Sequence, residues 1–189
     1  MNADDFRSHM LAGETILWTG QPAQGLMLTG RDGLLIPFSL FWGGFAIFWE
    51  STVARMPKAP AFMALFGVPF VLVGLYLIFG RFLVDAWVRG ATSYALTNQR
   101  ILIARQRPTR SFTAIDVDRL TDATLTERTD GSGTIVLAAA TAFLGAWGTN
   151  RSGLVAWTPS LDPIPKLLAI ADARRVFDQI QSAARAKAA

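Results

Sequence analysis

The stretch YALTNQRILIARQ, residues 94–106, decides the fold of this 189-residue chain. It contains two β-rich runs separated by Asn98 and Gln99, a pair that is compatible with a tight turn. Apolar residues occupy both faces of the second run: Ile101 and Ile103 on one, Leu102 and Ala104 on the other. Because neighbouring strand residues point to opposite faces, this strand is expected to be buried on both sides. The stretch predicts a hairpin inside a packed β domain.

The rest of the C-terminal half continues this pattern. TDGSG, residues 129–133, is a strong turn signal, because glycine supplies the positive φ that tight hairpins require. A helix is expected at about 172–186, with Asp172 as its N-cap and an apolar stripe that includes Phe177 and Ile180 closing the end of the sheet. The further strands are expected at RSFTAI (110–115), RLTDATLTE (119–127), TIVLAAA (134–140), GLVAWT (153–158) and KLLAI (166–170).

Two long uncharged stretches precede the β-rich half, at residues 33–49 and 59–80. A helix needs about 20 apolar residues to cross the hydrocarbon core of a bilayer. The alternative is a pair of buried core helices, but a chain of this size has little body in which to bury helices that are apolar all round. We therefore expect a transmembrane hairpin.

The chain is accordingly divided into three parts. Residues 1–32 form an N-terminal segment, residues 33–82 a transmembrane helical hairpin, and residues 91–187 a β domain with its C-terminal helix. The two membrane helices are expected at about 33–53 and 60–81. Because the link between them is short, both ends of the chain should lie on the same side of the membrane.

Charge predicts which side that is. Basic residues near the outer ends of the two helices outnumber those in the hairpin loop by four to two: Arg31, Arg81, Arg89 and Arg100 against Arg55 and Lys58. The positive-inside rule then favours cytoplasmic N- and C-termini, in the cytoplasmic (inner) membrane of a bacterium.

Composition argues against several function classes. The net charge of +4 comes from basic residues scattered among acids, which does not favour nucleic-acid binding. The chain has no cysteine, and its single histidine, His9, has no second metal ligand nearby. No phosphate loop, nucleophile elbow or HExxH motif occurs. We therefore expect no enzyme, no metal and no cofactor.

The order of these features resembles a known family. GETILWTGQP (13–22), two apolar helices, the YALTNQRILI hairpin (94–103) and a closing AIADARRVFDQI (169–180) are similar to the pleckstrin-homology-like (PH-like) domains of small bacterial membrane proteins. The resemblance implies a mainly-β PH-like β-roll capped by the C-terminal α-helix and anchored by the transmembrane hairpin. The apolar connection at 138–153 is longer than such a roll requires.

Two groups of residues are candidate contacts. The resemblance makes Arg105, Arg107 and Arg110 candidates for contact with anionic lipid, because PH domains grip headgroups with basic residues near early loops; ordinary solubilising charge is the alternative. Phe143 and Trp147 lie in the apolar connection. They could cover the sheet, enter the bilayer interface or contact a partner protein.

These observations predict a non-enzymatic membrane protein. Its leading function is protein–protein association or assembly at the membrane, with a membrane-protein partner or with further copies of itself. Sensing of anionic lipid headgroups is the alternative, and a subunit of an oligomeric pore or transporter is a remote one, since neither uncharged stretch carries an ionisable group.

Overall fold

The computed structural model describes residues 4–57, 60–139, 157–162 and 164–188. Two compact units are present, and each is considered by itself. The β unit comprises Met1–Gly25 together with Ala86–Ala189, and the helical unit comprises Leu26–Asp85. The helical unit is therefore an insertion within the β unit.

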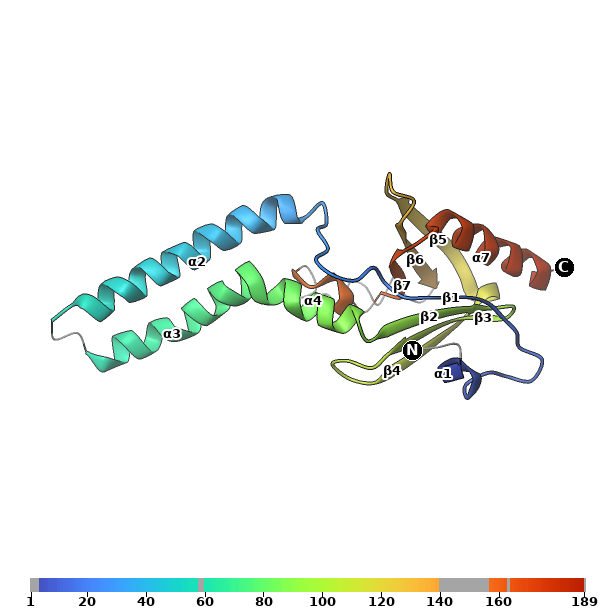
Figure 1. Cartoon of the computed structure of the whole chain (residues 1–189), viewed down its shortest axis with the longest axis horizontal. Helices are drawn as coiled ribbons and strands as arrows, with labels where there is room; N and C mark the ends of the chain where they lie inside the picture. The colour runs from blue at the N-terminus through green and yellow to red at the C-terminus, as the bar shows by residue number, and fades with distance from the viewer. Residues whose placement is uncertain (1–3, 58–59, 140–156, 163, 189) are drawn as a thin grey trace. The chain divides into compact units, whose positions relative to one another are not determined.

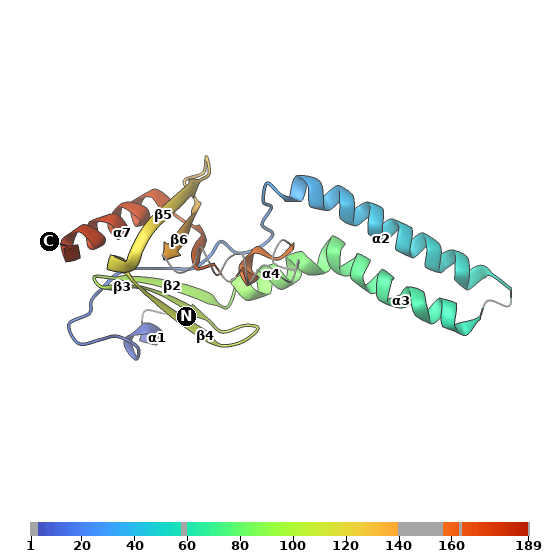
Figure 2. The same ribbon diagram turned by 180° about the vertical axis from the view of Figure 1, so that it is seen from behind.

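The β unit contains two antiparallel sheets (Figures 1 and 2). The first sheet has the order β1-β2-β3-β4, formed by Ile16–Gly20, Thr92–Thr97, Arg100–Arg105 and Ser111–Asp116. The second has the order β5-β6-β7, formed by Leu120–Glu127, Gly133–Ala139 and Lys166–Ile170. Short helices stand at Asp4–Arg7 (α1), Val117–Arg119 and Pro159–Leu161, and the unit ends with α7 at Ala173–Ala188.

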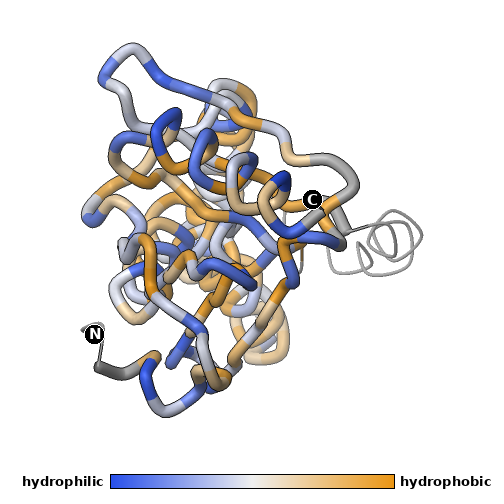
Figure 3. Tube along the Cα trace, turned by 90° about the vertical axis from the view of Figure 1, so that its right-hand side faces the viewer, coloured by the Kyte–Doolittle hydropathy of each residue, from blue (hydrophilic) through white to orange (hydrophobic). Residues whose placement is uncertain are grey.

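One hydrophobic core joins the two sheets and α7. Ile101 and Ile103 of β3 enter it from the first sheet, and Ile135 of β6 enters it from the second. Val176 and Ile180 of α7 are buried in the same cluster, with Phe177 packed against it. Figure 3 shows hydrophilic and hydrophobic residues alternating along the turns of this helix. The predicted capping helix, which begins one residue after Asp172, is confirmed.

The outer face of the first sheet is also covered. Leu102 and Ala104 of β3 are buried there against Phe6 of α1, which is 1% exposed. Ile16 packs against the same cluster. The prediction that β3 is buried on both faces is confirmed, and the cover on its second face comes from the N-terminal segment.

The prediction that residues 1–32 form a segment separate from the β domain is wrong. β1 is an edge strand of the first sheet and pairs antiparallel with β2, with Trp18 opposite Leu96 and Gly20 opposite Tyr94. The β domain therefore begins before the apolar helices. Sequence reading placed its start at residue 91 because the partner of β1 lies beyond the whole helical insertion.

The remaining strand predictions are confirmed except for one, which falls mostly outside the described residues. All the expected strands except one are present, and Gly131 in the 129–133 turn has φ +78°. The expected strand 153–158 falls mostly outside the described residues, and its last two residues, Trp157 and Thr158, are not in a strand. Most of the apolar connection 138–153 also lies outside the described residues.

The helical unit contains α2 at Asp32–Arg55 and α3 at Ala61–Leu75. A π-helical turn at Tyr76–Gly80 follows α3, and α4 at Arg81–Arg89 continues into the β unit. The second helix was expected to end near 81, but it runs to Arg89. Charged residues lower the hydropathy after Gly80 without breaking the helical backbone.

The contact between α2 and α3 is made by small residues. Gly43 and Gly74 meet so closely that a Cβ added to Gly74 would lie 2.8 Å from the Cα of Gly43. Ser39 and Ala46 are buried on the same side of α2. Such small residues are typical of the contacts between membrane helices, because they let two backbones approach each other.

The charged residues at the start of α2 and of α4 pair with each other. Arg81 donates to Asp32 Oδ1 at 2.6 Å and to the Leu77 carbonyl at 2.9 Å, and both charged side chains are buried. The Asp32 carboxylate also accepts hydrogen bonds from Thr29. The ends of the two helices are thus joined by a paired charge.

Candidate binding groove

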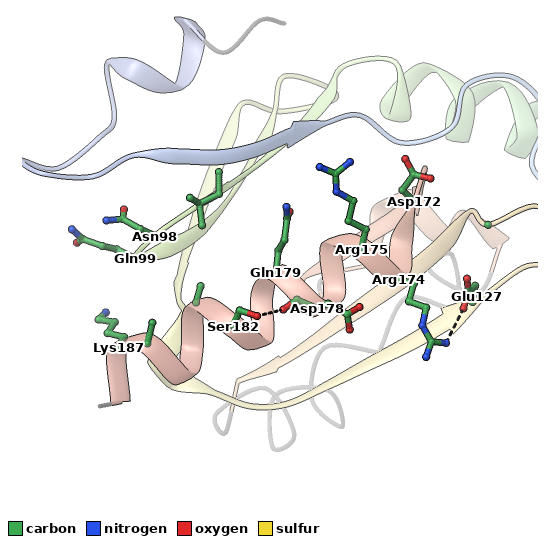
Figure 4. A pocket seen from close by; sticks show the side chains of 14 residues that line it. Asn98, Gln99, Glu127, Asp172, Arg174, Arg175, Asp178, Gln179, Ser182 and Lys187 are labelled. Atoms are coloured by element: carbon green, nitrogen blue, oxygen red, sulfur yellow. Dashed lines mark hydrogen bonds and ion pairs between the residues drawn. The ribbon is translucent and has the colours of Figure 1, made fainter.

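A groove of about 1330 Å³ runs along α7 in the β unit. Its opposite wall is formed by β1 and by the turn between β2 and β3, and Figure 4 shows side chains from both walls. We call it the α7 groove. The fold creates it because α7 packs on the second sheet while β1 forms the free edge of the first.

A β-bulge shapes the β1 wall. Ile16 and Trp18 oppose the neighbouring residues Thr97 and Leu96, which leaves Leu17 as the extra residue on β1. The bulge lets Ile16 pack on the outer face while Trp18 packs against the core. Leu17 lines the groove and is 49% exposed.

As an edge strand, β1 also offers backbone groups. Alternate residues of an antiparallel strand direct their N–H and C=O groups to opposite edges. Among the described strands, β1 pairs with β2 along one edge and with none along the other. The other edge can accept an added strand, which is a common way of binding extended peptides.

The α7 wall carries an amide oxygen and a cation that have no partner in the part of the chain that the structure describes. Gln179 Oε1 is buried and has no hydrogen-bond partner among the described residues. Gln179 and Arg175 both extend from α7 toward the opposite wall in Figure 4. Ala183 and Ala186 continue the wall with small side chains. A buried amide oxygen without a partner is unfavourable, so a donor supplied from outside would stabilise it.

The other cations of the groove have acidic partners. Arg174 Nη1 lies 3.8 Å from Glu127 Oε2, and Lys187 Nζ lies 3.3 Å from Asp118 Oδ1. These four side chains are at least about one-third exposed, so the pairs contribute little to stability. They leave a groove with both signs of charge, polar hydrogen-bonding groups and one exposed leucine.

The turn of the β2–β3 hairpin is hydrogen-bonded to the segment that leads into β1. Asn98 Oδ1 accepts a hydrogen bond from Thr15 N at 2.9 Å, and Asn98 N donates to the Thr15 carbonyl at 3.1 Å. The predicted turn at Asn98 and Gln99 is confirmed, and both residues line the groove. The turn thus positions the beginning of β1 at the groove.

The three predicted arginines do not form one cluster. Arg105 is partly buried and lines a second, smaller cavity. Arg107 is exposed, and its guanidinium lies 5.4 Å from the centre of the Trp87 ring. Arg110 is exposed in the 106–110 loop. Phe143 and Trp147 lie outside the described residues.

Sequence reading did not identify Leu17 or Gln179 as candidate residues. Leu17 sits in the quoted ETILWTG run, but a bulge is a property of pairing with a distant strand. Gln179 lies on the polar side of an amphipathic helix, where a buried oxygen has no local signal. Among the described residues, no group of three or more His, Cys, Asp or Glu side chains could hold a metal ion.

Comparison with known proteins gives one finding and two negative results. The family described as Bacterial PH domain matches residues 51–184, which begin in α2 and end in α7. β1 lies outside the matched range. No curated protein and no solved structure matches the chain.

Proposed function

Because the chain belongs to the Bacterial PH domain family, we propose that it is a non-enzymatic membrane protein that presents its β unit in the cytoplasm for protein–protein association at the bilayer. The partner is another membrane protein or a second copy of the chain. The observation that carries this proposal is the α7 groove, where the outer edge of β1, unpaired with any described strand, lies opposite the buried Gln179 Oε1, which has no partner among the described residues.

The packing of the helical unit supports a membrane location. Asp32–Arg55 and Ala61–Arg89 are long and apolar enough to cross a bilayer. Only 22% and 17% of the residues in their most apolar windows are buried, which is unlike the core helices of a soluble protein. Large apolar side chains such as Phe41, Phe48 and Leu65 are exposed, whereas small and paired charged residues are inside. This arrangement is stable in a lipid bilayer, where exposed apolar side chains contact the hydrocarbon core.

The length between charged residues supports the same location. From Asp32 to Glu50, α2 rises by about 27 Å at 1.5 Å per residue, close to the roughly 30 Å hydrocarbon thickness of a bilayer. The basic residues near the outer helix ends support cytoplasmic termini. Proteins of this family are commonly membrane proteins. We therefore propose the bacterial cytoplasmic membrane as the location.

The chemistry of the α7 groove favours a polypeptide partner. An edge strand recognises the backbone of an extended chain, and side-chain pockets beside it add specificity. The exposed Leu17 and the small Ala183 and Ala186 leave apolar surface for side chains of the partner. Gln179 lines the groove, and a backbone N–H of the partner would satisfy its Oε1, which has no partner among the described residues.

The proposal is tested by the native size of the protein extracted from its membrane in mild detergent. Leu17→Glu combined with Gln179→Glu should abolish a native assembly, because both place a charge in the groove. Thr124→Glu, on an exposed position of β5, is the matched control and should leave the assembly intact. An assembly that withstands the groove substitutions would contradict the proposal.

Anionic lipid sensing is the second candidate. Arg105, Arg107 and Arg110 lie at the end of β3 and in the loop that follows it, and Arg107 and Arg110 are exposed. Each basic side chain near an anionic leaflet contributes about 1 kcal/mol. Neutralising all three should then reduce binding of the β unit to anionic vesicles. Unchanged binding would remove this candidate.

A further inference from the structure

A second cavity, of about 250 Å³, lies within the β unit and is distinct from the α7 groove. It is bounded by the ends of β2, β3 and β4 and by the segment that leads into β7. The two concavities share no lining residue. What fills the second cavity is therefore a separate question from what binds the groove.

The strand register shows why this cavity is polar. Thr92, Arg105 and Ser111 lie in one row across the first sheet. The adjacent row on the same face contains Tyr94 and Ile103, which belong to the core between the sheets. The row of Thr92 therefore lies on the core-facing side. The inner face of the sheet changes from apolar to polar at this end.

Arg105 is the unusual member of the row. Its Nε is buried and has no hydrogen-bond partner among the described residues. No ion pair joins its guanidinium to a described carboxylate. Buried polar atoms are nearly always paired, so this Nε is unfavourable although the side chain as a whole is only partly buried. An anion in the cavity would supply the missing partner.

The other lining groups suit an oxyanion. Ser111 and Thr113 bring two hydroxyl donors to the same cavity. Lys166 and Asp162 also line it, and they neutralise each other through a contact of 2.8 Å. Two cations against one carboxylate leave a formal charge of +1. Guanidinium and hydroxyl donors together are the usual ligands of phosphate oxygens.

We propose that this cavity binds a small oxyanion of the phosphate class, held by the Arg105 guanidinium and the hydroxyls of Ser111 and Thr113. The anion is either a free phosphate or the phosphate of a lipid headgroup. Arg105 is then a ligand inside the β unit, whereas Arg107 and Arg110 are surface charges. The proposal does not depend on the partner proposed for the α7 groove.

Native mass spectrometry of the full-length protein in detergent tests the proposal. Inorganic phosphate is titrated in one arm and phosphatidic acid in the other, with phosphatidylcholine as the uncharged-headgroup control. The wild-type protein should bind one phosphate or one phosphatidic acid. Arg105→Gln should weaken that binding at least tenfold, whereas Arg185→Gln, which removes the same charge from an exposed position on α7, should change it less than twofold.

A second variant guards against misfolding of Arg105→Gln. Ser111→Ala combined with Thr113→Val retains the cation and should weaken binding at least threefold, with an unchanged melting temperature in the absence of anion. Binding of phosphate identifies a free oxyanion, and binding of phosphatidic acid alone identifies a headgroup. Absence of binding in both arms, or equal losses in the Arg105 and Arg185 variants, would overturn the proposal.

Discussion

Glu14 and Arg100 form an ion pair that joins the segment before the helical insertion to the strands after it. Arg100 donates from Nη2 to Glu14 Oε2 at 2.7 Å and from Nε to Oε1 at 3.1 Å, across 86 residues of sequence. Thr97 Oγ1 donates to the same carboxylate at 2.7 Å, as does Leu11 N. The Glu14 side chain is 0% exposed. The segment before the helices is thereby fixed to the β2–β3 hairpin that follows them.

This pair predicts a dependence of stability on pH. The hydrogen bond from Arg100 is the largest cause that lowers the pKa of Glu14, from 4.5 to about 2. A depressed pKa in the folded state gives stability that is present above pH 4.5 and lost as the pH falls toward 2. Over this pH range the free energy of unfolding should fall by about 3 kcal/mol. Denaturant unfolding in detergent, followed by tryptophan fluorescence at several pH values, measures it.

Glu14→Gln supplies the control for this pH dependence. The variant should be less stable at neutral pH, because Arg100 keeps its charge and loses its carboxylate, and it should lose the acid-dependent component. Glu14→Gln combined with Arg100→Gln should recover part of the stability, since no unpaired charge remains buried. Equal acid sensitivity in the wild type and Glu14→Gln would show that the pair does not titrate as proposed.

The place of β1 predicts which fragments fold. Residues 91–189 lack β1, so Leu96 and the rest of β2 lose a paired strand. A polypeptide that joins residues 1–25 to residues 86–189 by a short linker should fold cooperatively, whereas residues 91–189 alone should not. Thermal unfolding followed by circular dichroism distinguishes the two. Equal cooperativity would mean that β1 is dispensable.

The close approach of Gly74 to Gly43 predicts that a larger side chain at residue 74 weakens the contact between α2 and α3. Gly74→Val should destabilise the helical unit by about 1–3 kcal/mol, because the added side chain meets the backbone of Gly43. Gly44→Val is the matched control, since a Cβ at Gly44 meets nothing within 4 Å. Unfolding in detergent, compared for the two variants, tests the difference. Similar losses would indicate that the two helices do not pack through these glycines.

The hydrogen bonds of Arg89 are expected to stabilise the segment after β1. This side chain is 1% exposed and donates to the carbonyl oxygens of Ala23 and Gly25. Hydrogen bonds from a charged donor contribute about 1.5–3 kcal/mol each, so Arg89→Ala should be strongly destabilising. Arg110→Ala, at an exposed position, should change the free energy of unfolding by less than about 0.5 kcal/mol. Hydrogen exchange at residues 21–25 should rise only in the first variant.

Local patterns were sufficient for most of the β unit. Residues 94–106 predicted a hairpin whose second strand is buried on both faces, because its apolar residues are consecutive and so occupy both faces. The α7 helix was predictable because its apolar residues recur at helical spacing. The two apolar helices were predictable because their uncharged stretches are long enough to cross a bilayer, although charged residues hid the end of the second helix at Arg89.

Long-range relationships were not predictable from these patterns. Glu14 and Arg100 are both present in the quoted motifs, yet nothing local indicates that they meet. The role of β1 depends on β2, which lies beyond the helices. Leu17 and Gln179 become candidate binding residues only when an edge strand and a helix from opposite ends of the chain form one groove.

The measurement that tests the central proposal most directly is site-specific photo-crosslinking of the full-length protein in bacterial membranes. A photoreactive residue replaces Leu17 or Ala183 in the α7 groove, or Thr124 on β5 as the control. The proposal predicts a discrete crosslinked protein product, either a dimer of this chain or one with a membrane protein, from the groove positions and not from Thr124. No product from the groove positions, or the same products from Thr124, would contradict it.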